Sequence, residues 1–297
     1  MTNDALAELR AAYAKQVLAA GYVKDSPAVE AAFAAVRRED FLGPGPWQVV
    51  RFGKGYEPTP SADPAHLYTN DLFGLIPDRG LNNGQPSFHA LMLHAAAIAP
   101  GDHVVHVGAG VGYYTALMAH LAGPAGRVTG IEYDPGLADR AKASFATWPT
   151  VEILQGDGAT VPFAPADVIY VNAGATRPAD SWLDGLKAGG RLILPLTVNR
   201  PAGPDGIMAM AHVGGVLGIT RPGNGNGNSN SDSYPARWLS PTMIFPCAGG
   251  RDPVAEQVLA EALGRPEARN IARLIRSPHQ KDDRCIAHGE GWCLASA

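Results

Sequence analysis

The stretch from Val104 to Ala116 combines a short apolar run, three glycines at alternate positions and a helix-like continuation. Its valines are typical of a parallel strand that is buried on both faces. Gly108, Gly110 and Gly112 allow the backbone to turn sharply and a ligand to approach it closely. No helix breaker follows between Tyr113 and Leu121. The stretch therefore predicts a strand, a glycine turn and a helix, the arrangement with which α/β proteins bind nucleotides.

An acidic residue follows this turn at a meaningful distance. Glu132 ends a second apolar run and lies 20 positions after Gly112. In nucleotide-binding α/β folds, an acid at this place accepts hydrogen bonds from ribose hydroxyls. The glycine spacing is GxGxG, which does not fully meet the GxGxxG pattern of dinucleotide-binding proteins.

Strand and helix patterns alternate regularly from residue 103. We expect strands at 103–107, 127–132, 150–154, 167–172 and 190–196, and helices at 113–122, 135–147 and 178–187. This alternation predicts parallel pairing with right-handed crossovers. Asp157 and Gly158 follow the third strand, and Asn172 follows the fourth. They are placed at the carboxyl ends of strands, where open α/β sheets bind ligands.

The flanking regions are less regular. Before the sheet we expect a helix over Asp4–Ala20 capped by Asp4, and a second helix that begins at Ser26. The charged residues of Arg37–Leu42 should lie in solvent at the end of this second helix. A long ordered loop over 43–80 and a helix that begins at Pro86 follow. After Pro195 we expect a hairpin over Met208–Thr220 that turns at Gly214-Gly215, followed by a flexible loop over Asn224–Asp232. A strand over Arg237–Phe245 should come next. We expect two further helices, over Pro253–Leu263 and Arg269–Ile275. These patterns divide the chain into 1–80, 81–220 and 221–297.

Composition limits the partners of this chain of 297 residues. The formal net charge of −4 provides no general attraction to nucleic acid or to an anionic membrane. The amino terminus lacks a basic region followed by an apolar core, so we expect no signal peptide. No apolar run approaches the roughly 20 residues of a membrane helix. We therefore expect a cytoplasmic protein without a membrane partner, and the oligomeric state stays open.

The three cysteines, Cys247, Cys285 and Cys293, lie late in the chain. An odd number favours reduced thiols. With His288, the last two contain possible metal ligands, but no fourth ligand is apparent and the spacing matches no common zinc pattern. We therefore expect no bound metal.

The order of these motifs resembles that of class I S-adenosylmethionine-dependent methyltransferases, and more narrowly the protein-L-isoaspartate O-methyltransferase family. The similar segments span roughly residues 26–200 and comprise Arg38–Leu42, Gln85–Ala90, Val107–Tyr113, Gly156–Gly158 and Leu186–Pro195. The resemblance implies an α/β fold with a Rossmann-like methyltransferase sheet. This sheet is mostly parallel with a C-terminal antiparallel strand, and N-terminal helices and a C-terminal extension accompany it.

The resemblance also implies roles for particular residues, with S-adenosyl-L-methionine as the cofactor. The expected cofactor-binding residues are His89, Gly108, Ala109, Gly110, Gly112, Tyr113, Glu132, Tyr133, Asp157, Gly158 and Asn172. The expected catalytic residues are Asn83, Gly84 and Ser87. Gly84 departs from the family, which has a small hydroxyl residue at this position, two places before the proline.

Three hypotheses follow. The first is a carboxyl O-methyltransferase whose acceptor is an L-isoaspartyl residue in protein or a related carboxylate in a peptide or small molecule. The second is a nicotinamide-dependent oxidoreductase, against which the GxGxG spacing argues. The third is a non-catalytic protein that keeps the cofactor site for sensing or recognition, which Gly84 favours.

Overall fold

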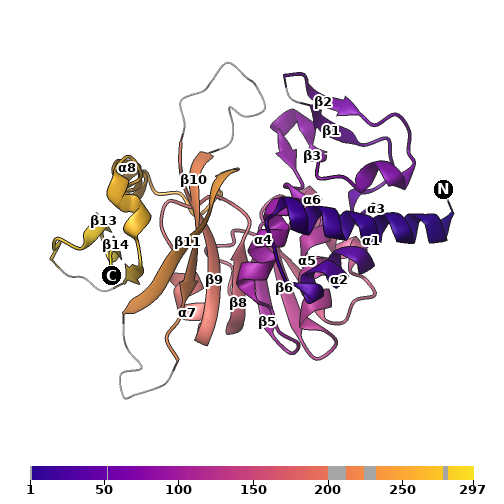
Figure 1. The fold of residues 1–297 in the computed structure, drawn as a ribbon. Helices are drawn as coiled ribbons and strands as arrows, with labels where there is room; N and C mark the ends of the chain where they lie inside the picture. The colour runs from indigo at the N-terminus through magenta and orange to yellow at the C-terminus, as the bar shows by residue number, and fades with distance from the viewer. Residues whose placement is uncertain (1, 52, 200–211, 224–231, 277–279) are drawn as a thin grey trace. The chain divides into compact units, whose positions relative to one another are not determined.

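A computed structural model describes residues 2–51, 53–199, 212–223, 232–276 and 280–297 (Figure 1). The chain divides into two compact units. Over the described residues, unit 1 comprises 2–104 and 109–156, and unit 2 comprises 105–108, 157–199 and the described residues from 212 onward. Strand β5 (His103–Val107) contributes residues to both units.

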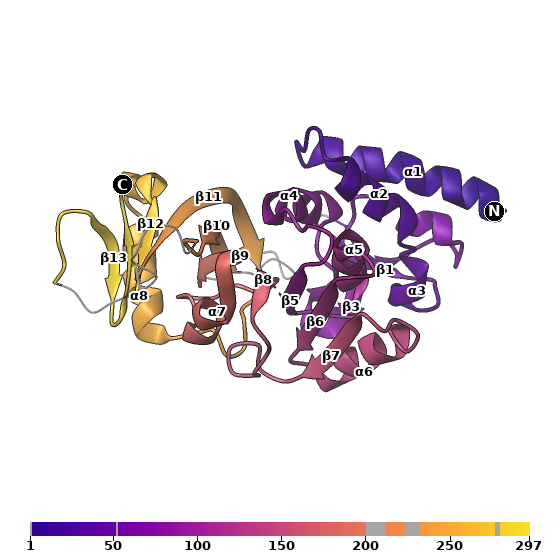
Figure 2. The ribbon, with the colours of Figure 1, turned by 90° about the horizontal axis from the view of Figure 1, so that it is seen from below.

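Unit 1 begins with three helices: α1 (Asn3–Ala20), α2 (Pro27–Ala35) and the short α3 (Glu39–Leu42). Helices α1 and α2 pack side by side (Figure 2). Thr2 caps α1 through its hydroxyl, which accepts from the N–H of Ala5, so the predicted cap at Asp4 is wrong by two positions. Ser26 precedes α2 as expected but makes no side-chain cap bond.

The prediction of solvated charges at the end of the second helix is wrong for Arg38. Its side chain is fully buried, and its guanidinium lies 5.1–5.6 Å from the ring centroids of Tyr13, Phe73 and Tyr113. It also donates to the carbonyls of Leu67 and Thr69. Cation–π attraction and the two hydrogen bonds of Nη1 offset part of the cost of removing the guanidinium from water.

The segment predicted as one long loop is ordered but contains regular elements. Strands β1 (Gln48–Arg51) and β2 (Gly55–Pro58) form one antiparallel pair, and β3 (Gly74–Ile76) and β4 (Leu81–Asn82) form another. Two 3-10 helices, η1 (Pro64–Leu67) and η2 (Pro77–Arg79), lie between them in sequence. These strands have two to four residues, too few to produce a periodic pattern.

The rest of unit 1 follows the predicted alternation. Its elements are α4 (Pro86–Ala96), the start of β5, α5 (Tyr113–Ala122), β6 (Arg127–Glu132), α6 (Pro135–Ser144) and β7 (Val151–Gln155). Strands β6 and β7 pair in parallel, with Glu132 opposite Gln155.

Unit 2 contains the remaining strands, in the hydrogen-bonded order β13-β14-β12-β11-β10-β9-β8-β5. Their bounds are β8 (Ala166–Val171), β9 (Leu186–Val198), β10 (His212–Thr220), β11 (Ser233–Ile244), β12 (Arg273–Ile275), β13 (Cys285–Gly289) and β14 (Trp292–Ala295). Strands β8 and β9 are parallel, whereas β9 through β14 pair antiparallel. The helices of this unit are α7 (Asp180–Gly185), α8 (Pro253–Leu263) and the 3-10 turn η4 (Pro266–Asn270). The predicted α/β class, with parallel strands followed by antiparallel pairing toward the C-terminus, is confirmed. The one antiparallel strand expected there is instead the series β10 to β14.

Two predictions after Pro195 are wrong. Gly214 and Gly215 lie inside β10, where they pair with β9 and β11 and do not form a hairpin turn. A Cβ at Gly214 would lie 1.9 Å from the carbonyl oxygen of Leu196, so close strand packing explains this glycine. The predicted helix at 269–275 is instead the end of η4 followed by β12. Most of the predicted flexible loop at 224–232 lies outside the described residues.

Candidate active site

The glycine turn after β5 has the predicted conformation. Gly108, Gly110 and Gly112 have φ angles of 80°, 57° and 96°, a region that side chains strongly disfavour. A Cβ at Gly112 would also lie 2.5 Å from the ring of Phe145. The turn in unit 1 is closed by the N–H of Gly112, which donates to the carbonyl of Ala109 at 2.9 Å. Glycine is therefore required here both by conformation and by the available space.

Glu132, at the end of β6, is joined to this turn by its side chain. It is only 8% exposed. One carboxylate oxygen accepts from the N–H of Gly110 at 2.7 Å, and the other accepts from the N–H of Asp134 at 2.9 Å. Burial raises the pKa of Glu132, and these two backbone donors partly oppose the shift. A carboxylate oxygen has further lone pairs, so Glu132 can accept additional hydrogen bonds from a ligand.

The residues after Glu132 differ in their surroundings. Tyr133 is 58% exposed. Asp134 caps α6 by accepting from the N–H of Leu137, and it forms an ion pair with Arg79 at 2.5 Å. Because Arg79 lies 55 positions earlier, in a 3-10 turn, sequence spacing contained no signal for this contact.

The turn before α4 brings Gly84 and His89 together. Gly84 has a φ of 76°, and a Cβ there would lie 2.3 Å from Nε2 of His89. The His89 ring stacks on Tyr114 with centroids 3.5 Å apart, and the Tyr114 hydroxyl donates to the Gly84 carbonyl at 3.2 Å. The volume that a side chain at position 84 would need is therefore filled by the imidazole of His89.

The other two expected catalytic residues are buried and firmly held. Asn83 exchanges two hydrogen bonds with the backbone of Phe73, one through its own N–H and one through its side-chain oxygen. The hydroxyl of Ser87 accepts from Nδ2 of Asn70 at 3.0 Å, and the N–H of Ser87 donates to Oδ1 of the same residue at 2.8 Å. Asn70 thus positions Ser87, a role that no periodic pattern in its segment indicated.

Two further expected residues are part of the packed interior. Ala109 is buried, and its N–H donates to the carbonyl of Ile131. The Tyr113 ring contacts Phe33, Phe41 and Tyr114 edge-on. Its side chain therefore packs the core, and a contact to a cofactor would have to come from its backbone.

Unit 2 holds the remaining expected residues. The Asp157 carboxylate accepts from the N–H of Ala159 at 2.9 Å, and the carbonyl of Gly158 accepts from the Trp182 indole at 2.8 Å. Gly158 packs so tightly that a Cβ would lie 2.3 Å from Val107. The N–H of Asn172 donates to the carbonyl of Val107 at 2.8 Å. These contacts place Asn172 beside the end of β5.

The segment between β11 and α8 lies next to Asp157, a contact that the sequence did not predict. A Cβ on Gly249 would lie 1.7 Å from Oδ2 of Asp157, so the Asp157 carboxylate lies directly against the backbone of Gly249. Nearby, Arg251 donates to the carbonyls of Gly174 and Thr197 at 3.2 and 2.9 Å. The C-terminal part of the chain therefore reaches the carboxyl end of β8.

Comparison with known proteins identifies the family. The model of the protein-L-isoaspartate(D-aspartate) O-methyltransferase family matches residues 11–203. A protein-L-isoaspartate O-methyltransferase of Ignicoccus hospitalis is 35% identical over 186 residues, which cover 61% of this chain and 79% of that protein. Protein-L-isoaspartate O-methyltransferase 2 of Archaeoglobus fulgidus is 37% identical over 145 residues, covering 45% of this chain and 66% of the relative.

Solved structures share the fold. A protein-L-isoaspartate O-methyltransferase aligns with a TM-score of 0.57 and 22% identity, covering 81% of this chain and 66% of the other. A Plasmodium falciparum structure described as a β-aspartate methyltransferase, in complex with S-adenosyl-L-homocysteine, aligns with a TM-score of 0.56 and 18% identity, covering 80% and 97%. Because the family model matches well over half of the 297 residues, the chain belongs to the protein-L-isoaspartate(D-aspartate) O-methyltransferase family.

Proposed function

We propose that this protein transfers the methyl group of S-adenosyl-L-methionine to a carboxylate, with an L-isoaspartyl residue in a protein or peptide as the first candidate acceptor. Family membership supports methyl transfer over the nicotinamide-dependent oxidation that the sequence left open. The observation that carries the proposal is the Glu132 carboxylate, which is buried at the end of β6 and bonded to the glycine turn.

The residues present are chemically suited to this cofactor. The glycine turn, whose φ angles are positive, would present backbone rather than side chains to the amino acid part, and Glu132 would accept from the ribose hydroxyls. Asp157 would accept from the exocyclic amine of adenine. Gly158, the next residue in sequence, and Asn172, which follows β8, would also contact the cofactor. His89 would flank the methyl donor.

The chemistry requires little acid–base help from the chain. A free carboxyl group has a pKa near 4 and is an anion at neutral pH. S-adenosyl-L-methionine supplies a methyl group on a positively charged sulfur, which makes the methyl carbon electrophilic. The chain must orient the acceptor oxygen and exclude water, and positioning of this kind contributes several kcal/mol. We assign this positioning to Asn83 and Ser87.

Position 84 bears on the choice of acceptor. The family has a small hydroxyl residue there, and the structure shows that His89 fills the corresponding space. We therefore keep a related carboxylate in a small molecule as the second candidate acceptor.

A transfer assay tests the proposal. Purified protein with methyl-labelled S-adenosyl-L-methionine is given an isoaspartyl peptide, the same peptide with ordinary aspartate, or a small dicarboxylic acid. We expect base-labile label on the isoaspartyl peptide and none on its aspartyl control. Label on the dicarboxylic acid alone would move the proposal to the second acceptor. Calorimetry that finds NAD binding without binding of S-adenosyl-L-methionine would overturn it.

We also propose that the protein works in the cytoplasm, without nucleic acid or membrane partners. All three cysteines carry thiols in the structure, and the net charge is negative. Among the helices that the structure describes, none has the length and apolar character needed to cross a membrane.

A further inference from the structure

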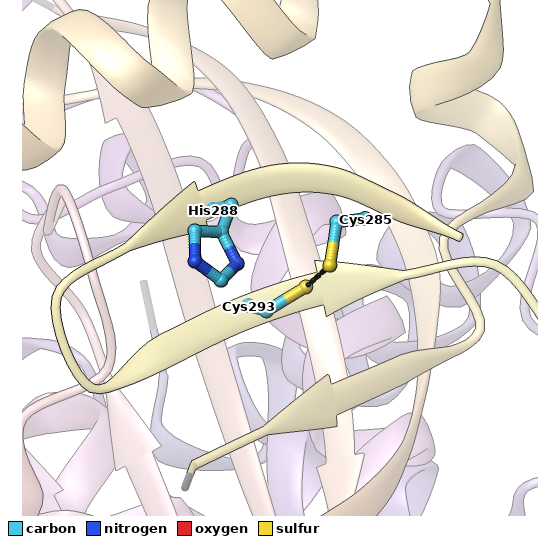
Figure 3. A group of neighbouring side chains, drawn as sticks. All are labelled: Cys285, His288 and Cys293. Carbon is cyan, nitrogen blue, oxygen red and sulfur yellow. Dashed lines mark hydrogen bonds between the residues drawn. The ribbon is translucent and has the colours of Figure 1, made fainter. Parts of the chain in front are cut away.

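Three potential metal ligands meet in the C-terminal hairpin of unit 2. Cys285 and His288 lie on β13, and Cys293 lies on β14 (Figure 3). The ligating atoms of all three residues lie within 4.8 Å of one another, and the two sulfur atoms are 2.9 Å apart. Both cysteines are buried, and His288 is half-buried. This cluster lies outside residues 11–203, which the family model matches.

A β-bulge makes this cluster possible. Residues three apart on a regular strand point to opposite faces, which would separate Cys285 from His288. The pairing of β13 with β14 shifts register between Cys285 and Ala287, so one extra residue enters β13. The shift brings His288 directly opposite Cys293 and Cys285 opposite Ala295. Because Cys293 and Ala295 share a face, all three ligands are brought to that face.

Neighbouring elements support the bulge. Arg265, just after α8, donates to the carbonyl of Ile286, the extra residue, at 2.6 Å. The strands join through a two-residue turn in which Gly291 has a φ of 72°. Ile275 of β12, which pairs with Cys293, packs against the two cysteines. The bulge backbone is therefore fixed by a hydrogen bond, and the two cysteines are packed against an apolar side chain, before any ligand binds.

We propose that Cys285, His288 and Cys293 form a binding site for a thiophilic divalent cation, with Zn²⁺ as the best match. Two thiolates and one imidazole are donors that Zn²⁺ prefers. Tetrahedral bonds of about 2.3 Å to sulfur place the two thiolates of one ion about 3.8 Å apart. The sulfur atoms are 2.9 Å apart in the structure, so they must separate by roughly 0.9 Å as the ion enters. All three ligating atoms already lie within 4.8 Å of one another, so this is a small side-chain movement.

The three residues leave a fourth position on a tetrahedral ion. Asp282 lies close in sequence, but its carboxylate accepts from the Arg284 guanidinium at 2.7 Å and from the Arg284 N–H at 3.0 Å. We therefore do not assign it as a ligand and assign the fourth position to water. The ion would connect β13 to β14, in the part of the molecule with the shortest strands of unit 2.

A reversible disulfide is the competing interpretation of the short sulfur–sulfur distance. It would use the two cysteines and would not involve the imidazole of His288. The presence of His288 opposite Cys293 favours the metal site, because the histidine completes a donor set that a disulfide does not need.

Cobalt substitution tests the site on the full chain. The reduced protein is stripped with a chelator, the chelator is removed, and Co²⁺ is added as a spectroscopic probe. We expect one Co²⁺ per chain, thiolate-to-cobalt absorption in the near ultraviolet, and loss of that absorption when Zn²⁺ is added. Zn²⁺ should also raise the melting temperature of the stripped protein.

Variants identify the ligands. Cys293→Ser and His288→Ala should each weaken Co²⁺ binding at least about 100-fold, since even indirect changes around a metal site cost 10–100-fold. Cys247→Ser is the matched control, because it removes a buried thiol outside the cluster. If Cys293→Ser does not fold, His288→Ala at its half-buried position decides the question.

Two outcomes would overturn the proposal. One is the absence of cobalt absorption in the reduced wild-type protein, or absorption that all variants retain. The other is a native protein that lacks two hydrogens in its intact mass, has one reactive thiol and binds no metal, which would establish a disulfide. Neither outcome depends on methyl transfer, so this proposal and the proposed function fail separately.

Discussion

At the scale of single residues, Glu132 has the most direct test. Glu132→Ala removes charge-assisted hydrogen bonds worth roughly 1.5–3 kcal/mol, so affinity for S-adenosyl-L-homocysteine should fall roughly tenfold to a hundredfold. Titration calorimetry measures this change. Glu152→Ala, an exposed glutamate on β7, is the control and should leave affinity unchanged. Equal affinity in the Glu132 variant would mean that the ribose binds elsewhere.

The same residue predicts a pH dependence. Burial raises the pKa of Glu132 above its ordinary value of 4.5, so it takes up a proton at a higher pH than an exposed glutamate. Protonation removes acceptor capacity, and affinity for S-adenosyl-L-homocysteine should therefore decline as the pH falls through this raised pKa. Glu132→Gln should weaken binding and flatten this decline. An unchanged pH profile in that variant would contradict the assignment.

The shift has the opposite sign for folding. A raised pKa means that the folded state binds the proton more tightly than the unfolded chain. The contribution of Glu132 to stability is therefore fully present below pH 4.5 and is lost as the pH rises through the pKa in the folded state. A fall in pH therefore increases the contribution of Glu132 to folding stability and weakens its hydrogen bonds to the ligand.

Gly84 and His89 form a pair that must change together. Gly84→Ser places a side chain at a φ of 76° and 2.3 Å from the His89 imidazole. We expect backbone strain to cost about 1–3 kcal/mol of unfolding free energy and overlap with the imidazole to add to this loss. Methyl transfer should fall because the imidazole is displaced. Gly123→Ser is the matched control, because Gly123 has a φ of 66° and open space around it. Adding His89→Ala to Gly84→Ser should recover part of the stability; no recovery would contradict the steric explanation.

At the scale of elements, the segment between β11 and α8 sets the surroundings of Asp157. Gly249→Ala would place a methyl group 1.7 Å from the Asp157 carboxylate, and overpacking of this kind typically costs 1–3 kcal/mol. We expect lower thermal stability together with weaker S-adenosyl-L-homocysteine binding. Gly223→Ala, at an open position, should change neither. If the Gly249 variant is destabilised but still binds S-adenosyl-L-homocysteine normally, the assignment of Asp157 to the adenine is wrong.

Prediction of elements from sequence succeeded where the pattern was long and local. Strands β5, β6 and β8 and helix α5 match the predicted ranges closely, because buried parallel strands and helices repeat their apolar residues at fixed spacing. The prediction failed for β10, since its glycines adapt to close strand packing and look like a turn in sequence. It also failed for β12, whose three residues carry no period.

At the scale of the whole molecule, Arg251 ties the C-terminal part to the sheet of unit 2. Its guanidinium donates to the carbonyls of Gly174 and Thr197 and pairs with Glu256 at 2.6 Å. Arg251→Ala leaves these partly buried acceptors without their donor, so the unfolding free energy should fall by about 1–3 kcal/mol in denaturant titrations. Arg237→Ala, at an exposed position on β11, is the comparison. Equal stability of the two variants would show that Arg251 is not a structural link.

The sequence by itself determined the strand–glycine turn–helix unit, the parallel alternation, the place of Glu132 and the resemblance to the family. Each of these depends on residues close together in the chain, where backbone conformation and periodicity act locally. Tertiary structure alone decided that Arg38 is buried among aromatic rings, that Gly249 abuts Asp157 and that His89 fills the space beside Gly84. It also decided that a bulge unites Cys285 with His288. These contacts depend on strand register and side-chain packing between distant segments, which residue spacing does not encode.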